Sequence, residues 1–494
     1  MIVMKNKFII LPILIALFFE SCTDKFEEYN TDTKNPAIVS AESLFSNGQL
    51  TLVDQVSSTN VNLNVWKLFA QYWTETTYTD EANYDVVTRT IPDNTFQAYY
   101  RGFLRDFQEA ESIINWPTNT DAPGVKANKL AIIELHNVYA YQNLVDIFGN
   151  IPYGEALDIE NYSPVYEDGF TIYKDLITRV DAALASLDPA SPSFGSADLI
   201  FGGDVIQWRK FANSLKLKLG VAIADHDVAL SKATVEAAVT DGVLMSSDDN
   251  AILVYLGATH TNPIYQDVVQ SGRDDFVPAN TVVDLMNTLA DPRRPYYFTT
   301  VDTSSTDVEK LAYVGGIYGE SNPFSQYSHI ADQIILPDFP GIVITYDEVL
   351  FYMAEAAARG FTVGSTAAGL YNQAVTESVL WWGGTPAEAA AYLAQPSVTF
   401  SLPAWREKIG TQAYIAFYTR GLEGYTQWRR LDYPILNVPP AISSDPVAPT
   451  DYLDIPKRFT YPINEQTLNK TNYDQASTAI GGDNLTTKIF WDKF

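Results

Sequence analysis

The sequence predicts a mainly α-helical fold that carries a loop-rich, partly β insertion. Apolar residues recur at three- to four-residue spacing on both sides of the middle of the chain, which is the period of one helix face. Residues 240–345 lose this period and are rich in Gly, Pro, Ser, Thr, Asp and Asn, as loops and short strands are. Hydrophobic residues make up 46 % of the 494 residues and charged residues 19 %, which is typical of a globular protein.

The chain begins with the pattern of a secretory signal followed by a lipidated cysteine. Lys5 and Lys7 precede an apolar run from Phe8 to Phe19, and a small residue stands directly before Cys22, the only cysteine. The run is too short to cross a bilayer, which needs about 20 residues. We therefore predict a lipoprotein signal peptide over residues 1–21 and lipidation of Cys22. The alternative is an ordinary buried cysteine, or a signal peptide that happens to contain one.

Residues 22–45 are predicted to be an acylated N-terminus and a tether to the folded body. Asp24, Glu27, Glu28 and Asp32 follow the cysteine closely, and Asn35-Pro36 disfavours a continuous helix. The acids resemble a signal for export to the cell surface, and an ordinary solvated tether explains them equally well.

Residues 46–494 are predicted to form one domain, with helical scaffold segments at 46–239 and 346–433. Breaks such as Trp116-Pro117, Gly149 and Asp188-Pro189 end the periodic stripes. Each stripe needs a neighbour to cover it, so we expect helical hairpins stacked side by side, at a spacing too irregular for a clean repeat. The tail, residues 434–494, is expected to wrap this body. The stripes cover 96–114, 131–148, 170–187, 206–223, 346–359, 370–381 and 405–417.

Aromatic residues are frequent, with 30 Tyr, 25 Phe and 9 Trp. Core packing explains most of them, whereas some in loops are candidates for platforms that stack on sugar rings or peptide side chains. The loop-rich region at 240–345 is predicted to face the ligand. The candidate ligand-binding residues are Trp73, Tyr78, Tyr84, Tyr265, Tyr313, Tyr318 and Tyr327.

The composition excludes some classes of function and leaves others open. A formal net charge of −28 repels phosphate backbones, so we expect no nucleic-acid partner. The four histidines lack metal-ligand spacing, and no nucleophile elbow, P-loop or dinucleotide fingerprint occurs. The sequence therefore predicts no catalytic residues and no cofactor, although the acidic stretches at 225–227 and 247–250 could offer oxygen ligands to Ca²⁺. A glycosidase needs two facing carboxylates. The chain has 60 acidic residues, so pairs by chance are certain and the sequence alone cannot exclude this class of enzyme.

Several longer segments resemble the SusD/RagB-like nutrient-binding lipoproteins of Bacteroidetes. They are FGNIPYGEA (148–156), DPRRPYYF (291–298), YDEVLFYMAEAAARG (346–360), KIGTQAYIAFYTRGLEGYTQWRRLDYP (408–434) and IPKRFTYPINEQTLNKTNY (455–473). Each also has a structural interpretation. Arg429 and Arg430 would anchor a helix end, and Arg458 and Tyr461 would fix a turn, so these motifs are expected to define the fold rather than to touch ligand.

The resemblance implies a scaffold of tetratricopeptide-like helix pairs, lipid-anchored to the outer membrane. It implies capture of an oligosaccharide at the cell exterior and delivery to a SusC-like TonB-dependent transporter, without chemistry. The alternatives are a peptide-binding RagB-type lipoprotein, a surface glycoside hydrolase, and a structural subunit that closes the transporter.

Overall fold

The computed structural model describes residues 39–304, 310–440 and 454–494. The predicted Cys22 anchor and most of the predicted tether lie outside these residues. The N-terminal helices are α3 (Ala41–Ser57), α4 (Trp66–Phe69), α5 (Ile91–Gln97), the π-helix η2 (Ala98–Leu104), α6 (Arg105–Asn115), α7 (Pro123–Phe148), α8 (Gly169–Ser186), α9 (Val205–Ala222) and α10 (Val228–Asp241). The later helices are α11 (Pro263–Tyr265), the π-helix η5 (Gln266–Gln270), α12 (Asn280–Thr288), α13 (Arg294–Tyr297), α14 (Tyr346–Ala358), α15 (Ala367–Trp381), α16 (Pro386–Leu393), α17 (Trp405–Ala416), α18 (Gly421–Leu431), α20 (Ile463–Leu468) and α21 (Lys470–Ala479).

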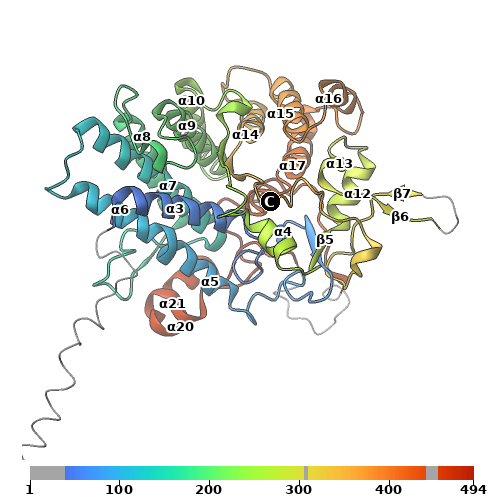
Figure 1. Cartoon of the computed structure of the whole chain (residues 1–494), viewed down its shortest axis with the longest axis horizontal. Coiled ribbons are helices and arrows are strands. Elements are labelled where there is room, and N and C mark those ends of the chain that lie inside the picture. The colour runs from blue at the N-terminus through green and yellow to red at the C-terminus, as the bar shows by residue number, and fades with distance from the viewer. Residues whose placement is uncertain (1–38, 305–309, 441–453) are drawn as a thin grey trace, which may run out of the picture.

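The long helices pack side by side in a row that runs through both halves of the chain (Figure 1). The contacts pass from α3 to α6, α7, α8 and α9, and then to α14, α15 and α17. The step from α9 to α14 joins helices that are separated in sequence by the loop-rich region. The predicted mainly helical fold with a loop-rich, partly β insertion is therefore confirmed.

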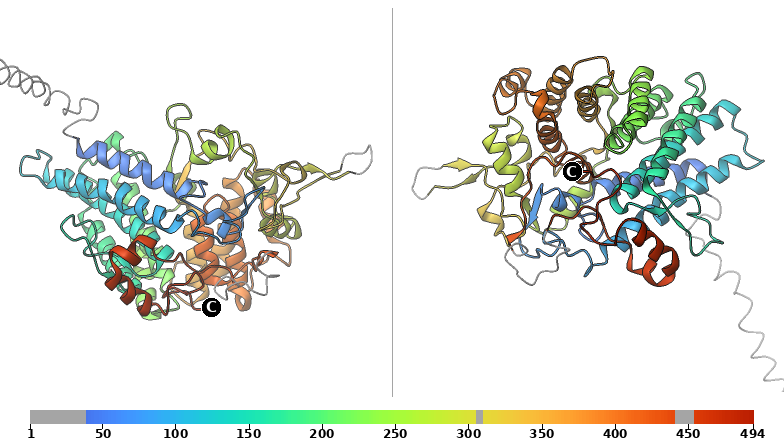
Figure 2. Two further views of the ribbon diagram at one scale, coloured as in Figure 1. Left: turned by 90° about the horizontal axis from the view of Figure 1, so that it is seen from below. Right: turned by 180° about the vertical axis from the view of Figure 1, so that it is seen from behind.

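Four short antiparallel strand pairs accompany the helices. The pairs are β1 (Trp73–Glu75) with β5 (Phe276–Pro278), β2 (Ile151–Pro152) with β3 (Tyr166–Glu167), β4 (Ala251–Leu253) with β8 (Gly341–Ile344), and β6 (Val301–Asp302) with β7 (Leu311–Ala312). The β6–β7 pair projects from the body, as Figure 2 shows. The β1–β5 pair attaches the loop-rich region to the N-terminal half, because its strands lie about 200 residues apart in the sequence.

Two glycines let α18 lie against the α4 segment. A Cβ atom on Gly424 would stand 2.0 Å from the Tyr72 hydroxyl, and one on Gly421 would stand 2.4 Å from the Lys67 amide nitrogen. Tyr72 donates a 2.5 Å hydrogen bond to the Tyr414 carbonyl oxygen, and Tyr414 donates one of 2.8 Å to the Ala70 carbonyl. Because Gly421 and Gly424 carry no side chain, α18 can approach the α4 segment this closely.

The C-terminal end of α7 is where several distant segments meet. Gly149 ends the helix with a φ of 84°, which favours glycine. Arg429 donates 2.6 Å to the Asp146 carbonyl, Arg458 donates 3.0 Å to the Phe148 carbonyl, and the Phe459 amide donates 2.8 Å to the Ile147 carbonyl. Cations at a helix C-terminus satisfy unpaired carbonyls and oppose the helix dipole. The prediction that Arg429 and Arg458 anchor the fold is confirmed.

Helix boundaries agree with the predicted breaks, and one predicted boundary needs correction. α6 ends one residue before Trp116, and α8 ends before Asp188-Pro189. However, α3 begins at Ala41, so residues 41–45 belong to the first helix rather than to the predicted tether. The helix starts here because the Ser40 side chain caps it by accepting a hydrogen bond from the Ser43 amide. The tail also contains α20 and α21, which its Pro and Asn content concealed.

Candidate functional site

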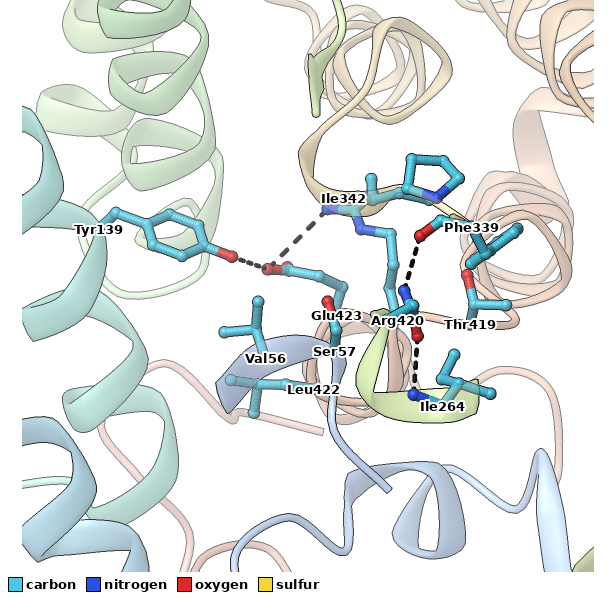
Figure 3. A pocket seen from close by; sticks show the side chains of 12 residues that line it. Val56, Ser57, Tyr139, Ile264, Phe339, Ile342, Thr419, Arg420, Leu422 and Glu423 are labelled. Carbon is cyan, nitrogen blue, oxygen red and sulfur yellow. Dashed lines mark hydrogen bonds and ion pairs between the residues drawn. The ribbon is translucent and has the colours of Figure 1, made fainter. Parts of the chain in front are cut away.

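A small pocket lies at the junction of the helical halves and is too small for a sugar (Figure 3). It holds about 20 Å³, close to the room that one water molecule needs. Glu423 accepts a 3.4 Å hydrogen bond from the Tyr139 hydroxyl and lies 4.0 Å from Arg420. These buried charges pair with each other, so the pocket is part of the scaffold.

Two larger clefts lie next to the β1–β5 pair and share Arg273, Asp275 and Phe276 in their walls. The charged cleft holds about 240 Å³, and the aromatic cleft holds about 330 Å³. Together they reach the size range of small-molecule sites. Residues that line the charged cleft include Asn60, Asn62, Glu75, Tyr78, Arg89 and Asp267, and those that line the aromatic cleft include Val268, Asp274, Phe324, His329, Ile330 and Asp332.

The position of the clefts follows from the strand pairing. Glu75 on β1 lies opposite Phe276 on β5, and beyond the strands the Thr76 amide donates 3.0 Å to the Asp275 carbonyl. The Thr76 hydroxyl donates 2.6 Å to the Asp274 carbonyl. These bonds fix the turn that carries Arg273, whose guanidinium lies 2.8 Å from the Asp275 carboxylate at the rim.

The charged cleft is backed by two buried carboxyl groups. Glu75 is 4 % exposed and its Oε2 accepts a 3.0 Å hydrogen bond from the Ala82 amide. The Glu81 carboxylate is fully buried and lies 2.5 Å from the Arg89 guanidinium. Burial and the neighbouring Glu81 carboxyl raise the pKa of Glu75 to about 9. At neutral pH this part of the wall therefore carries one negative charge rather than two.

A buried lysine lies behind the same cleft. Lys67 donates to the Ser57 and Ser58 carbonyls at 2.8 and 3.0 Å, and burial lowers its pKa to about 7. Asp267 accepts from the Thr59 amide at 3.2 Å and from the Thr59 hydroxyl at 2.9 Å, and burial raises its pKa. Hydrogen bonds to backbone groups and to the Thr59 hydroxyl thus hold Lys67 and Asp267 in place, without an ion pair between these two side chains.

The aromatic cleft contains a stacked ring pair. The Phe324 and His329 rings lie 3.8 Å apart at an angle of 13°, and His329 Nε2 lies 3.1 Å from the Phe324 carbonyl oxygen. Both residues are half-buried, and apolar residues of η5 and Ile330 complete the wall. A flat, fixed ring face beside polar groups is suited to a ligand that has both apolar and hydroxyl surface.

Three of the predicted ligand residues are buried in the core, and this corrects their assignment. Trp73, Tyr84 and Tyr318 are at most 1 % exposed, so their ring faces are already covered. The Trp73 indole donates 3.0 Å to the Tyr418 hydroxyl, and the Tyr84 ring packs edge-on against Phe69. Their aromatic character serves packing, the interpretation that explains most of the aromatic residues.

The other four predicted residues differ in position. Tyr78 is 63 % exposed and lines the charged cleft. Tyr265, Tyr313 and Tyr327 are half-buried and line neither cleft. Tyr313 instead lies under the Arg294 guanidinium, 5.4 Å from its ring centroid. Ligand contact by these residues stays a prediction.

The sequence alone did not single out Arg89, Arg273, Phe276 or His329. A usable signal was the polar turn Gly272-Arg273-Asp274-Asp275 directly before the apolar Phe-Val-Pro of β5, since such a turn places charges at the end of a strand. The partner strand, by contrast, could not be identified from local sequence.

The acidic stretches considered for Ca²⁺ are engaged by the protein itself. Asp225 pairs with Arg359 at 2.5 Å, Asp227 caps α10, and Asp249 pairs with Lys210 at 2.5 Å. Within the part of the chain that the structure describes, no group of three or more His, Cys, Asp or Glu side chains is arranged to hold a metal ion. In the same described ranges, no helix is both long and apolar enough to cross a membrane.

A family model settles the relationship of this chain. The model, described as "Starch-binding associating with outer membrane" and named SusD-like, matches residues 33–462. The chain belongs to the SusD-like family. The predicted resemblance is thereby confirmed over most of the chain. The comparison with curated proteins finds no match.

Solved structures agree in fold. A SusD homolog from Bacteroides uniformis is 25 % identical, with a TM-score of 0.76, and the match covers 91 % of this chain and 99 % of that one. A chitin-binding SusD homolog from Flavobacterium johnsoniae is 20 % identical, with a TM-score of 0.77 and coverage of 91 % and 98 %. A third structure, described as a chitin-binding protein, is 24 % identical, with a TM-score of 0.78 and coverage of 92 % and 100 %.

Proposed function

We propose that this protein is a non-enzymatic lipoprotein of the outer membrane that captures an oligosaccharide at the cell surface. The observation that carries the proposal is the fixed Phe324–His329 ring pair in a cleft that shares wall residues with the charged cleft. Sugar rings present apolar faces to aromatic side chains and hydroxyl groups to charged and amide ones. Family membership and the chitin-binding descriptions of two relatives support a glycan as the ligand class.

The two buried carboxyls behind the charged cleft do not support hydrolysis. A retaining glycosidase needs its two carboxyl groups about 5 Å apart, and an inverting one needs a larger gap for water. Glu75 is 4 % exposed and the Glu81 carboxylate is fully buried, so a sugar cannot reach between them. Binding without chemistry is therefore the better use of this site.

Binding is tested by isothermal titration calorimetry with starch-derived and chitin-derived oligosaccharides. Phe324→Ala should weaken glycan binding roughly fivefold to tenfold, since one ring contact contributes about 1–1.5 kcal/mol. Tyr78→Ala tests the charged cleft in the same way. Tyr162→Ala is a matched control, because this tyrosine is 86 % exposed and lines neither cleft. Equal affinities for Phe324→Ala and Tyr162→Ala would place the glycan elsewhere.

Delivery to a SusC-like TonB-dependent transporter belongs to the same proposal and needs its own experiment. The full chain with its signal should co-purify with such a barrel from outer membranes, and purified complexes should retain glycan. Recovery of peptides instead of glycans by mass spectrometry would favour the RagB-type alternative. A complex that binds neither ligand would indicate a purely structural subunit.

A further inference from the structure

A further cleft, called here the helical cleft, lies among α6, α7 and α8. It holds about 340 Å³ and shares no lining residue with the charged cleft or the aromatic cleft. Its walls follow from helix spacing, because residues three or four positions apart lie on one face of a helix. The lining residues at this spacing are Leu104, Gln108 and Glu111 along η2 and α6, Asn137 and Tyr141 on α7, and Asp175 and Arg179 on α8. Residues between 153 and 157 complete the lining.

One wall of the helical cleft contains a buried asparagine without a hydrogen-bond partner. Asn137 is 8 % exposed, and no described residue forms a hydrogen bond with its side-chain amide. Asn128 on the same helix is fully buried and shows the usual arrangement. Its amide nitrogen donates to backbone carbonyls of residues 188–192 at 2.8 to 3.0 Å, and its oxygen accepts from the Asp188 amide at 2.7 Å. A buried amide without partners destabilises the fold, so groups of a ligand in the cleft are suited to supply them.

Two tyrosine rings and an arginine form a fixed part of the wall. Arg179 donates to both carboxylate oxygens of Glu134 and, at 2.6 Å, to the Tyr153 hydroxyl. Its guanidinium carbon lies 5.7 Å from the Tyr141 ring centroid and 5.5 Å from the Tyr153 ring centroid. The Tyr153 hydroxyl donates 2.5 Å to the Asp175 carboxylate. The rings are therefore held in place before any ligand arrives, and Glu134 already neutralises the charge of Arg179.

The rim of the helical cleft carries negative charge without a balancing cation. Glu111 and Asp175 are exposed, and neither forms an ion pair among the described residues. Partial burial and the neighbouring Glu134 carboxylate raise the pKa of Glu111, as expected where like charge is not compensated. These carboxylates repel an anion and attract an ammonium group. The Asn137 amide, which can both donate and accept, matches a hydroxyl group.

We propose that the helical cleft is a second ligand site, for a small molecule that carries a protonated amino group beside hydroxyl groups. The ammonium group pairs with the Glu111 and Asp175 carboxylates, a hydroxyl group bonds to the Asn137 amide, and the apolar surface lies against Tyr141 and Leu157. An amino sugar has this chemistry, and the volume of the cleft is in the range of small-molecule sites. The inference goes beyond glycan capture in the charged and aromatic clefts and does not depend on it.

The probe is D-glucosamine, whose binding to the full-length chain is measured by calorimetry at pH 6, where its amino group is protonated. D-Glucose and N-acetyl-D-glucosamine have the same ring without the charge. D-Glucosamine should bind about tenfold more tightly than either, since a hydrogen bond to a charged group contributes more than a neutral one. Failure of D-glucosamine to bind, or equal affinities for the three sugars, would overturn the inference.

Variants locate the bound amine. Glu111→Gln should weaken D-glucosamine binding about tenfold, because the amide cannot pair with an ammonium group. Glu109→Gln is the matched control on α6, since Glu109 lies 3.6 Å from Arg105 and lines none of the three clefts. Phe324→Ala should leave D-glucosamine binding unchanged even where it weakens glycan binding. If D-glucosamine binding falls in Phe324→Ala and persists in Glu111→Gln, the amine binds in the aromatic cleft and the second site is refuted.

Asn137→Ala separates a ligand contact from a structural role. The substitution breaks no hydrogen bond, so the urea midpoint should be equal to or above that of the wild type, while D-glucosamine binding falls about fivefold. Asn128→Ala should unfold at clearly lower urea, because it leaves buried backbone groups unpaired. A similar loss of stability in Asn137→Ala would show that its amide serves the fold, and this result would contradict the proposed site.

Discussion

Glu348 holds together three elements of the scaffold, and its replacement should be among the most damaging changes to stability. Its fully buried carboxylate lies 2.5 Å from the Arg420 guanidinium and 3.6 Å from the Lys218 ammonium, and it accepts a 2.9 Å bond from the Tyr352 hydroxyl. It also closes the capping box at the start of α14. Lys218 is on α9 and Arg420 precedes α18, so one side chain joins the two helical halves.

The expected loss follows from what Glu348→Gln leaves behind. Arg420 and Lys218 are at most 7 % exposed, and Glu423 would be the only carboxylate left within 4 Å of them among the described residues. Removing one partner of a buried ion pair typically costs about 3–5 kcal/mol, because the remaining charge stays buried without compensation. The amide retains the shape and part of the hydrogen bonding, so we expect a loss near 3 kcal/mol.

Glu388→Gln is the matched control for this substitution. Glu388 closes the corresponding capping box of α16 with Thr385, but it does so at the surface and without a cation nearby among the described residues. Urea unfolding followed by tryptophan fluorescence should give a much lower midpoint for Glu348→Gln and a nearly unchanged one for Glu388→Gln. Similar midpoints for the two variants would refute the reasoning that the buried charges, rather than the cap, carry the effect.

Three further predictions test the core, its pH response and the anchor. Gly424→Ala should destabilise the protein by about 1–3 kcal/mol in the same urea assay, because its Cβ would collide with the Tyr72 hydroxyl. Burial lowers the pKa of His136 to about 4. Between pH 6.5 and pH 4 only the unfolded chain takes up the proton, so the free energy of unfolding should fall by up to about 3 kcal/mol over this range. His136→Gln should flatten this pH dependence. Cys22→Ala should leave the protein unprocessed or release it from the membrane fraction, and a variant that stays membrane-bound without its barrel would contradict a lipid anchor.

The helices were predictable because local signals specify them. Apolar spacing shows the face that α7 and α9 bury, and Gly149 shows where α7 ends. The candidate site was not predictable to the same degree, since β1 and β5 pair across about 200 residues. In loops without a period, nothing in the sequence distinguishes an exposed tyrosine such as Tyr78 from a buried one such as Tyr84.

The family motifs lie in a part of the molecule that lines neither the charged cleft nor the aromatic cleft. FGNIPYGEA supplies the end of α7, while the segments with Arg429 and Arg458 supply donors to its last carbonyls. Replacing either arginine would leave buried carbonyls unpaired, which constrains these residues whatever the ligand is. The clefts instead depend on side chains such as Phe324 and Arg273, which lie outside all the quoted motifs. The motifs thus account for the scaffold and not for these two clefts, so the ligand has to be argued from the clefts rather than from the motifs.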